Sequence, residues 1–110
     1  MSRSTLGEFE HQVLLAILRH GSESYSVDIV VELEKRTGRE VATAAVYVAL
    51  RRLKEKGLLR DRMVEPGEDG GHTRRYFSLT PKAMDALRES RQGYLRLWEG
   101  VESLLDESQA

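Results

Sequence analysis

Several residue types are absent or scarce in this sequence of 110 residues. It has no cysteine, which excludes disulfides, thiolate metal sites and cysteine nucleophiles. Its three histidines, His11, His20 and His72, lack the H-E-x-x-H spacing of a metal or catalytic pair, so we expect no metal site and no enzyme. The longest purely apolar run, Val13 to Leu18, has six residues, where about 18 are needed to span a bilayer. Because no secretory segment follows Met1, the sequence predicts a cytoplasmic protein without a cofactor.

A large net charge is also lacking. The chain has 17 Lys and Arg against 18 Asp and Glu, so its overall field does not favour a polyanion. The distribution is uneven, however: Arg39 to Arg62 holds seven basic and three acidic residues, whereas four acidic residues and no basic one follow from Glu99 onward. A basic segment is typical of nucleic-acid contact, but the helix dipole also favours basic residues late in a helix. Charge alone leaves both interpretations open.

Three helices are predicted in the first half of the chain. The first, over residues 6–20, follows the capping-box pattern Thr5-x-x-Glu8. The second begins at Ser26, whose hydroxyl is expected to cap it. The third, over residues 43–56, has an apolar stripe at helical spacing that predicts a buried face.

In the second half of the chain, the spacing of apolar residues changes from a helical to a strand-like pattern. Residues 58–64 and 74–79 have the pattern of strands and are separated by turn residues, which predicts a β-hairpin. Thr80-Pro81 is a strong helix start, and the helix is expected to reach about Leu105 before a frayed tail. The expected fold is therefore mostly α with a small β-hairpin. It combines a winged helix-turn-helix domain over residues 1–80 with a C-terminal dimerisation helix and tail over residues 81–110.

The third predicted helix is the candidate DNA reader. If Val46, Leu50 and Leu53 face the core, the opposite side carries small residues, an aromatic hydroxyl and cations. Small residues let a helix approach base edges, while Tyr and Arg can reach phosphates or guanine. The hairpin adds arginines on both strands, although Glu65, Glu68 and Asp69 make its tip acidic and unfavourable for phosphate. The predicted DNA-binding residues are Thr43, Ala44, Tyr47, Val48, Arg51, Lys54, Arg60, Arg62, Arg74 and Arg75.

The last helix has the pattern of a dimerisation element. Six mostly apolar residues alternate three and four positions apart, as in a coiled-coil seam: Leu87, Ser90, Tyr94, Leu97, Val101 and Leu104. Such a helix is longer than one side of a domain this small, so part of the seam is expected to meet a second copy and its first helix. The predicted dimer residues are Phe9, Val13, Leu14, Ile17, Leu87, Tyr94, Leu97, Val101 and Leu104.

Four segments resemble the PadR family of bacterial transcriptional regulators. Residues 45–59, AVYVALRRLKEKGLL, are similar to its AVYxxLxRLxEKGL signature, and residues 6–11, 25–29 and 75–81 resemble the family in the same order. The resemblance is to the short members with a single C-terminal helix. It implies a homodimeric winged-helix repressor on a dyad-symmetric operator, with Tyr47 as the DNA-contacting helix tyrosine. Ser26 stands where the family usually has Gly, and Ala42 stands near a usual Ser cap.

The same resemblance raises the question of a small-molecule effector. Some short members bind flat hydrophobic compounds or phenolic acids between subunits, and Trp98, Tyr94, Phe9 and Leu15 are the candidates for lining such a pocket here. The alternative for Trp98 is a filler of the core or interface. Two other functions stay open: a winged helix that binds an acidic partner protein, and a ligand sensor that does not bind DNA.

Overall fold

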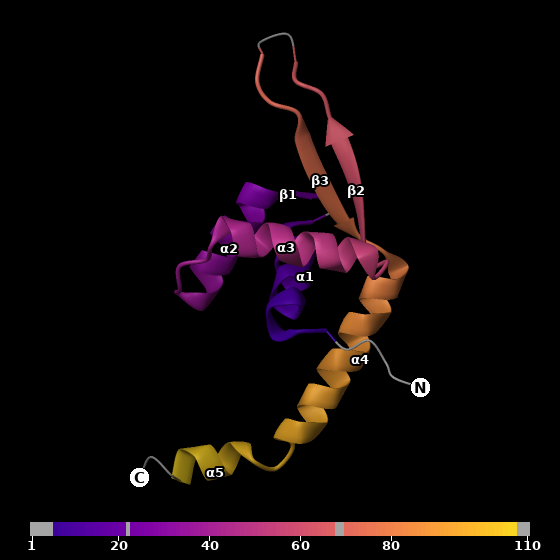
Figure 1. Cartoon of the computed structure of the whole chain (residues 1–110). Helices are drawn as coiled ribbons and strands as arrows, with labels where there is room; N and C mark the ends of the chain where they lie inside the picture. The colour runs from indigo at the N-terminus through magenta and orange to yellow at the C-terminus, as the bar shows by residue number, and fades with distance from the viewer. Residues whose placement is uncertain (1–5, 22, 68–69, 108–110) are drawn as a thin grey trace.

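The computed structural model describes residues 6–21, 23–67 and 70–107. A body of three helices carries a small sheet on one side and a C-terminal arm on the other (Figure 1). In chain order the elements are α1 (Glu8–His20), β1 (Ser24–Tyr25), α2 (Ser26–Thr37), α3 (Thr43–Glu55), β2 (Leu59–Val64), β3 (Arg74–Leu79), α4 (Pro81–Trp98) and α5 (Glu102–Glu107). The expected class, mostly helical with a small sheet, is confirmed. No helix in this described part of the chain is long and apolar enough to cross a membrane.

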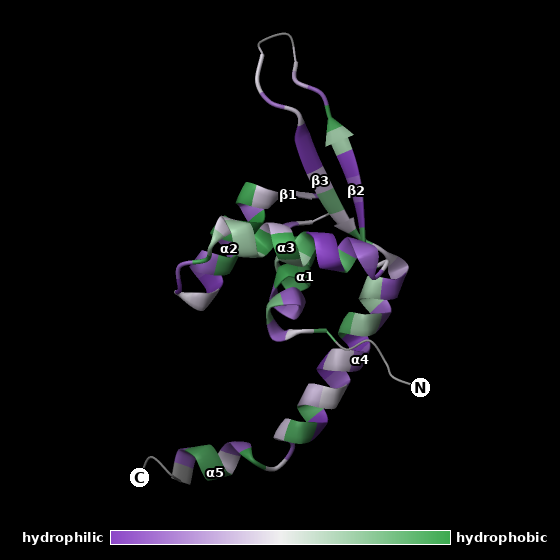
Figure 2. Ribbon diagram, viewed as in Figure 1, coloured by the Kyte–Doolittle hydropathy of each residue, from purple (hydrophilic) through white to green (hydrophobic). Residues whose placement is uncertain are grey.

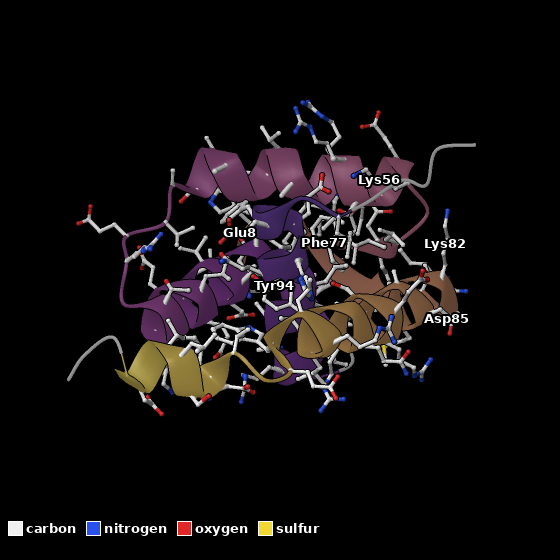
Figure 3. All side chains as sticks on the ribbon, turned by 90° about the horizontal axis from the view of Figure 1, so that it is seen from below. Glu8, Lys56, Phe77, Lys82, Asp85 and Tyr94 are labelled. Carbon is white, nitrogen blue, oxygen red and sulfur yellow. The ribbon has the colours of Figure 1, made fainter. Side chains whose placement is uncertain are left out.

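The core lies where α1, α2 and α3 meet the sheet. Helix α3 buries Val46, Leu50 and Leu53, as its spacing predicts, and β3 contributes Phe77. Seen from below, Phe77 lies inside the body while Lys82 lies at its outer edge (Figure 3). Burial of this one apolar stripe orients α3, so that its opposite side faces solvent.

The starts of α1 and α2 differ from expectation. Helix α1 begins at Glu8 with Gly7 as its N-cap, and the Gly7 amide donates to the Glu10 carboxylate at 3.3 Å. The expected box with Thr5 is therefore wrong in register, and Thr5 itself lies outside the described residues. Helix α2 has Tyr25 at its N-cap with no side-chain cap bond, so the capping role expected for Ser26 is also wrong.

One ion pair fastens α1 to the end of α3. Lys56, the C-cap residue of α3, donates to Glu10 Oε1 at 2.7 Å, and both side chains are largely buried. Burial raises the pKa of the Glu10 carboxyl, but Lys56, the Gly7 amide and Arg52 together outweigh it and hold the pKa below its ordinary value. The pair therefore favours the ionised carboxylate in the folded protein.

The sheet is antiparallel in the order β1-β3-β2. The hairpin is as expected, but the two-residue strand β1 is an addition, because so short a segment has no period to detect. Since side chains alternate across a strand, the register opposes Asp61 to Phe77 and Met63 to Arg75 on one face. We call this the inner face. Arg62 opposes Tyr76 on the other, which we call the outer face.

The start of α4 matches the sequence prediction. Thr80 is the N-cap: its hydroxyl accepts from the Ala83 amide at 3.2 Å and donates to the Gly57 carbonyl at 2.8 Å, with Pro81 in the first turn. Lys82 also donates to the Lys56 carbonyl at 2.8 Å. These bonds anchor the helix to the turn between α3 and β2.

The end of α4 does not match. The helix stops at Trp98 and Gly100 adopts a φ of 85°, after which α5 runs in a new direction (Figure 1). Only glycine reaches this left-handed conformation without strain, so the seam expected to run unbroken to Leu105 is interrupted. Of the tail expected to fray, residues 106–107 belong to α5 and residues 108–110 lie outside the described residues.

Candidate nucleic-acid interface

A groove of about 680 Å³ separates α3 from the inner face of the hairpin. Figure 1 shows why it forms: α3 lies across the base of β2 and β3, which project beyond it. We call it the α3–wing groove; its lining includes Tyr47, Arg51, Lys54, Met63, Thr73 and Arg75. Four of the predicted DNA-binding residues, Tyr47, Arg51, Lys54 and Arg75, are therefore brought together here.

Tyr47 is held in this groove by a residue of α2. Its side chain is 53% exposed, yet the buried Ser26 hydroxyl donates to its phenolic oxygen at 3.2 Å. This bond fixes the phenolic oxygen beside the start of α2, while the rest of the ring stays accessible in the groove. Ser26, expected as a cap, is thus a positioning residue for Tyr47.

Asp61 joins two of the groove cations. Its Oδ2 atom lies 3.0 Å from Lys54 Nζ and 3.4 Å from Arg75 Nε. Arg75 Nε also donates to the Met63 sulfur at 3.4 Å. One carboxylate on β2 therefore links α3 to β3.

The other three hairpin arginines lie on the outer face, away from the groove. Arg62 makes two hydrogen bonds to Glu23, at 2.9 and 2.7 Å, and lies over the Tyr76 ring at 5.9 Å. Arg74 lies over the Tyr25 ring at 5.2 Å. Arg60, which opposes Ser78, is exposed on the same face. The hydrogen bonds from Arg62 hold the pKa of the Glu23 carboxyl below its ordinary value. Seven of the ten predicted residues thus divide between two surfaces, four in the groove and three on the outer face.

The remaining predicted residues belong to α3. Thr43 and Ala44 are exposed in its first turn, after an N-cap, Ala42, whose side chain makes no cap bond. Val48 is exposed on the side of α3 toward α1, where it lines a hollow with Phe9 and Arg52. The acidic tip is described only in part, since Glu68 and Asp69 lie outside the described residues.

Sequence reasoning missed two residues that hold groove side chains, Asp61 and Ser26 in its positioning role, and outside the groove it missed Glu23, the partner of Arg62. For Asp61 a signal was present, because strand alternation places it on the same side as Met63 and opposite Arg60 and Arg62. For Ser26 and Glu23 there was none, because their partners are 21 and 39 residues away in the chain.

The predicted dimer residues fall into two groups. Val13, Leu14 and Ile17 have 0% exposure and Leu87 is also buried, so these four belong to the core of a single chain. Their assignment to a dimer surface is wrong in this packing, because an apolar centre on α1 is covered by α2, α3 and the sheet. Phe9 is half-buried against the same core. Tyr94, Leu97, Val101 and Leu104 are exposed on the arm formed by α4 and α5.

The four candidate ligand residues do not come together in one chain. Leu15 lines a shallow apolar hollow between α1 and α2, and Phe9 lines hollows beside α3. Tyr94 and Trp98 are exposed on the arm. The hollows that Leu15 and Phe9 line are different ones, and neither Tyr94 nor Trp98 lines them. The described residues also contain no cluster of three metal-binding side chains.

Comparison with known sequences decides the family. The model of the transcriptional regulator PadR-like family matches residues 14–89, well over half of the chain. The chain belongs to the PadR-like family of transcriptional regulators. A search of curated protein sequences found no significant match.

Solved structures of this family have the same fold. A PadR-like transcription factor from Bacteroides fragilis is 29% identical, with a TM-score of 0.72 over 87% of this chain and 88% of that one. A PadR family regulator from Eggerthella lenta is 27% identical, with a TM-score of 0.68 over 84% of this chain and 80% of that one. Bacillus subtilis PadR in complex with operator DNA is 17% identical, with a TM-score of 0.64 over 74% of this chain and 45% of that one, which shows a shared fold.

Proposed function

We propose that this PadR-family protein is a sequence-specific repressor that binds a dyad-symmetric operator as a homodimer. The observation that carries the proposal is the α3–wing groove, where Tyr47, Arg51, Lys54 and Arg75 converge from two elements. The helix presents side chains able to contact base edges, and the hairpin adds a cation for the phosphates beside them. Bacillus subtilis PadR, which shares the fold, has been crystallised with operator DNA.

The groove chemistry suits DNA better than an acidic protein partner. Tyr47 and Arg51 combine a phenol and a guanidinium on an exposed helix face, and Arg51 is well suited to bidentate bonds with guanine. The first turn beside them has only the small side chains Thr43 and Ala44, which permit close approach to a groove floor. In this arrangement the outer-face arginines act at most on neighbouring phosphates.

The arm supplies the second half of the proposal, the homodimer. Tyr94, Leu97 and Leu104 are more than half exposed, and Figure 2 shows apolar residues recurring along the lower part of α4 and in α5. Apolar surface of this extent on a small protein favours a covering partner. A second copy of this chain is the simplest covering partner, because twofold symmetry would also place two copies of α3 on two half-sites of the DNA.

An effector is a further part of the proposal. Trp98 and Tyr94 are the aromatic side chains that a second copy would bring near each other, so a flat hydrophobic or aromatic compound would bind between subunits. Trp98 is the single tryptophan, and quenching of its fluorescence by such a compound would report binding directly. A compound that binds there and also releases operator DNA would identify an inducer.

The test begins with DNA just upstream of the gene for this protein, compared with unrelated DNA in an electrophoretic shift. We expect selective retardation of the upstream fragment, and a footprint with dyad symmetry. Arg51→Ala is expected to weaken operator binding by about 1–3 kcal/mol, because a directed base or phosphate contact is lost. Arg88→Ala is the matched control, since Arg88 is also an exposed arginine, on α4, and is paired with Asp85.

Each alternative predicts a different result. A protein-binding module would leave both fragments unshifted at low salt, where phosphate contacts are strongest. A sensor that does not bind DNA would bind its ligand with unchanged affinity in Arg51→Ala and Tyr47→Ala. Equal loss of DNA affinity in Arg51→Ala and Arg88→Ala would contradict the assignment of α3 as the reading helix.

A further inference from the structure

An acidic residue, Asp61, lies directly behind two cations of the α3–wing groove. Asp61 Oδ2 lies 3.0 Å from Lys54 Nζ and 3.4 Å from Arg75 Nε, so one oxygen serves cations from two different elements. A carboxylate beside a phosphate-binding surface opposes binding by charge alone. Its presence therefore calls for a role other than simple attraction.

The exposure of the three side chains indicates how they are layered. Lys54 and Arg75 are 50% and 52% exposed and line the groove, whereas Asp61 is 16% exposed and does not line it. The carboxylate thus lies behind the cations and points them outward. It also neutralises one of their two charges.

These two effects act in the same direction on selectivity. Sequence-independent binding comes from cations that reach phosphates on any duplex, and freely moving side chains do this well. Sequence-specific binding needs groups held at fixed positions relative to the base edges. A half-buried carboxylate that restrains two cations and lowers their net charge weakens the first kind of binding and supports the second.

We propose that Asp61 is a positioning residue that sets the selectivity of this interface for its DNA sequence. The inference rests on the DNA-binding function proposed above and goes beyond it by naming what limits binding to the wrong sequence. Asp61 does this through Lys54 and Arg75, with no contact of its own to DNA.

The outer face of the hairpin provides a matched control. Glu23 pairs with Arg62 through hydrogen bonds of 2.7 and 2.9 Å, so it too is a carboxylate that joins a neighbouring segment to the hairpin. Arg62 does not line the groove. Asp61→Asn and Glu23→Gln each remove one negative charge that pairs with a hairpin arginine, Arg75 or Arg62, and they differ in the face of the hairpin that they affect.

The experiment compares two duplexes for each variant at one salt concentration. The first duplex is the sequence that the full-length wild-type protein enriches from a random pool, and the second is the same sequence with its bases shuffled. For Asp61→Asn we expect tighter binding to the shuffled duplex and a ratio of the two affinities that falls by about 3- to 30-fold, the effect of two exposed ion pairs. Glu23→Gln is expected to keep the wild-type ratio, and Asp61→Glu, which restores the charge, to recover most of it.

Three results would overturn the proposal. One is an unchanged affinity ratio in Asp61→Asn, and another is an equal fall in Glu23→Gln, which would reduce the effect to net charge. If Asp61→Asn does not fold, as judged by circular dichroism, the single variants Lys54→Gln and Arg75→Gln are compared with the double variant instead. Because the two cations share one carboxylate, their effects on the ratio of the two affinities should be non-additive. Strictly additive effects are the third result that would overturn the proposal. A wild-type protein that enriches no sequence would instead remove the proposed function itself.

Discussion

At the scale of single residues, the start of α3 is incompletely stabilised. Ala42 occupies the N-cap with φ −70° and ψ 127°, the extended geometry that a capping serine uses, but offers no side-chain acceptor to the first-turn amides. Ala42→Ser should therefore raise the free energy of unfolding by about 0.5–2 kcal/mol. Urea denaturation checks this, with Ala45→Ser as the control, because the same hydroxyl inside the first turn caps nothing. A gain of equal size in both variants would contradict the capping argument.

The Glu10–Lys56 pair predicts a specific dependence on pH. The folded protein holds the pKa of Glu10 below its ordinary value of 4.5, so the unfolded chain binds the proton more readily. The contribution of the pair to stability is therefore complete above about pH 4.5 and is lost as the pH falls through the folded pKa. Acid should thus weaken the contact that fastens α1 to α3.

Lys56→Met tests that dependence. We expect the free energy of unfolding at pH 7 to fall by about 1–3 kcal/mol, because a largely buried carboxylate loses its charged donor. The further loss as the pH falls from about 5 to about 3 should shrink, since the Lys56 hydrogen bond and charge no longer lower the pKa of Glu10 against the effect of burial. Arg36→Gln, which breaks the exposed Glu32–Arg36 pair, is the comparison and should have a much smaller effect. Parallel pH profiles of Lys56→Met and the wild type would contradict the role of the pair.

At the scale of elements, regular and locally encoded features were the predictable ones. The spacing of Val46, Leu50 and Leu53 correctly located the buried side of α3, and Thr80-Pro81 correctly marked the start of α4. Both signals depend only on residues within a few positions of one another. The order of helices and hairpin could therefore be derived, and with it the general position of the groove.

The features that were missed depend on contacts between residues distant in sequence, or on a competition between two weak local interactions. Ser26 could serve as a cap or as a donor to Tyr47, and only the approach of α3 decides between them. Helix α4 could continue past Gly100 or turn there, and because residues 94–106 are exposed, packing gives little preference for a straight helix. The division of the hairpin arginines between two faces follows from alternation and could have been predicted once the register was known.

At the scale of the whole molecule, the arm is the part whose apolar surface is not covered. Leu97 is 76% exposed, and α4 carries it away from the body (Figure 1). Leu97→Asp should shift the protein from dimer to monomer in sedimentation, because association would bury an unpaired carboxylate. Gln92→Asp adds the same charge on another side of α4 and should leave the dimer intact. A dimer that persists in Leu97→Asp at micromolar concentration would contradict the role proposed for the arm.

The alternation of faces in the hairpin also bears on how this protein can change in evolution. A residue inserted within Leu59–Val64 would move every following side chain to the opposite face, so that Asp61 and Met63 could exchange places with the outer arginines. The segment that connects β2 to β3 lies outside the strands, so its length does not decide which face a strand side chain is on. Its length can change in descendants of this chain without moving strand side chains to the opposite face, whereas the strands can accept substitutions but not a change in their number of residues.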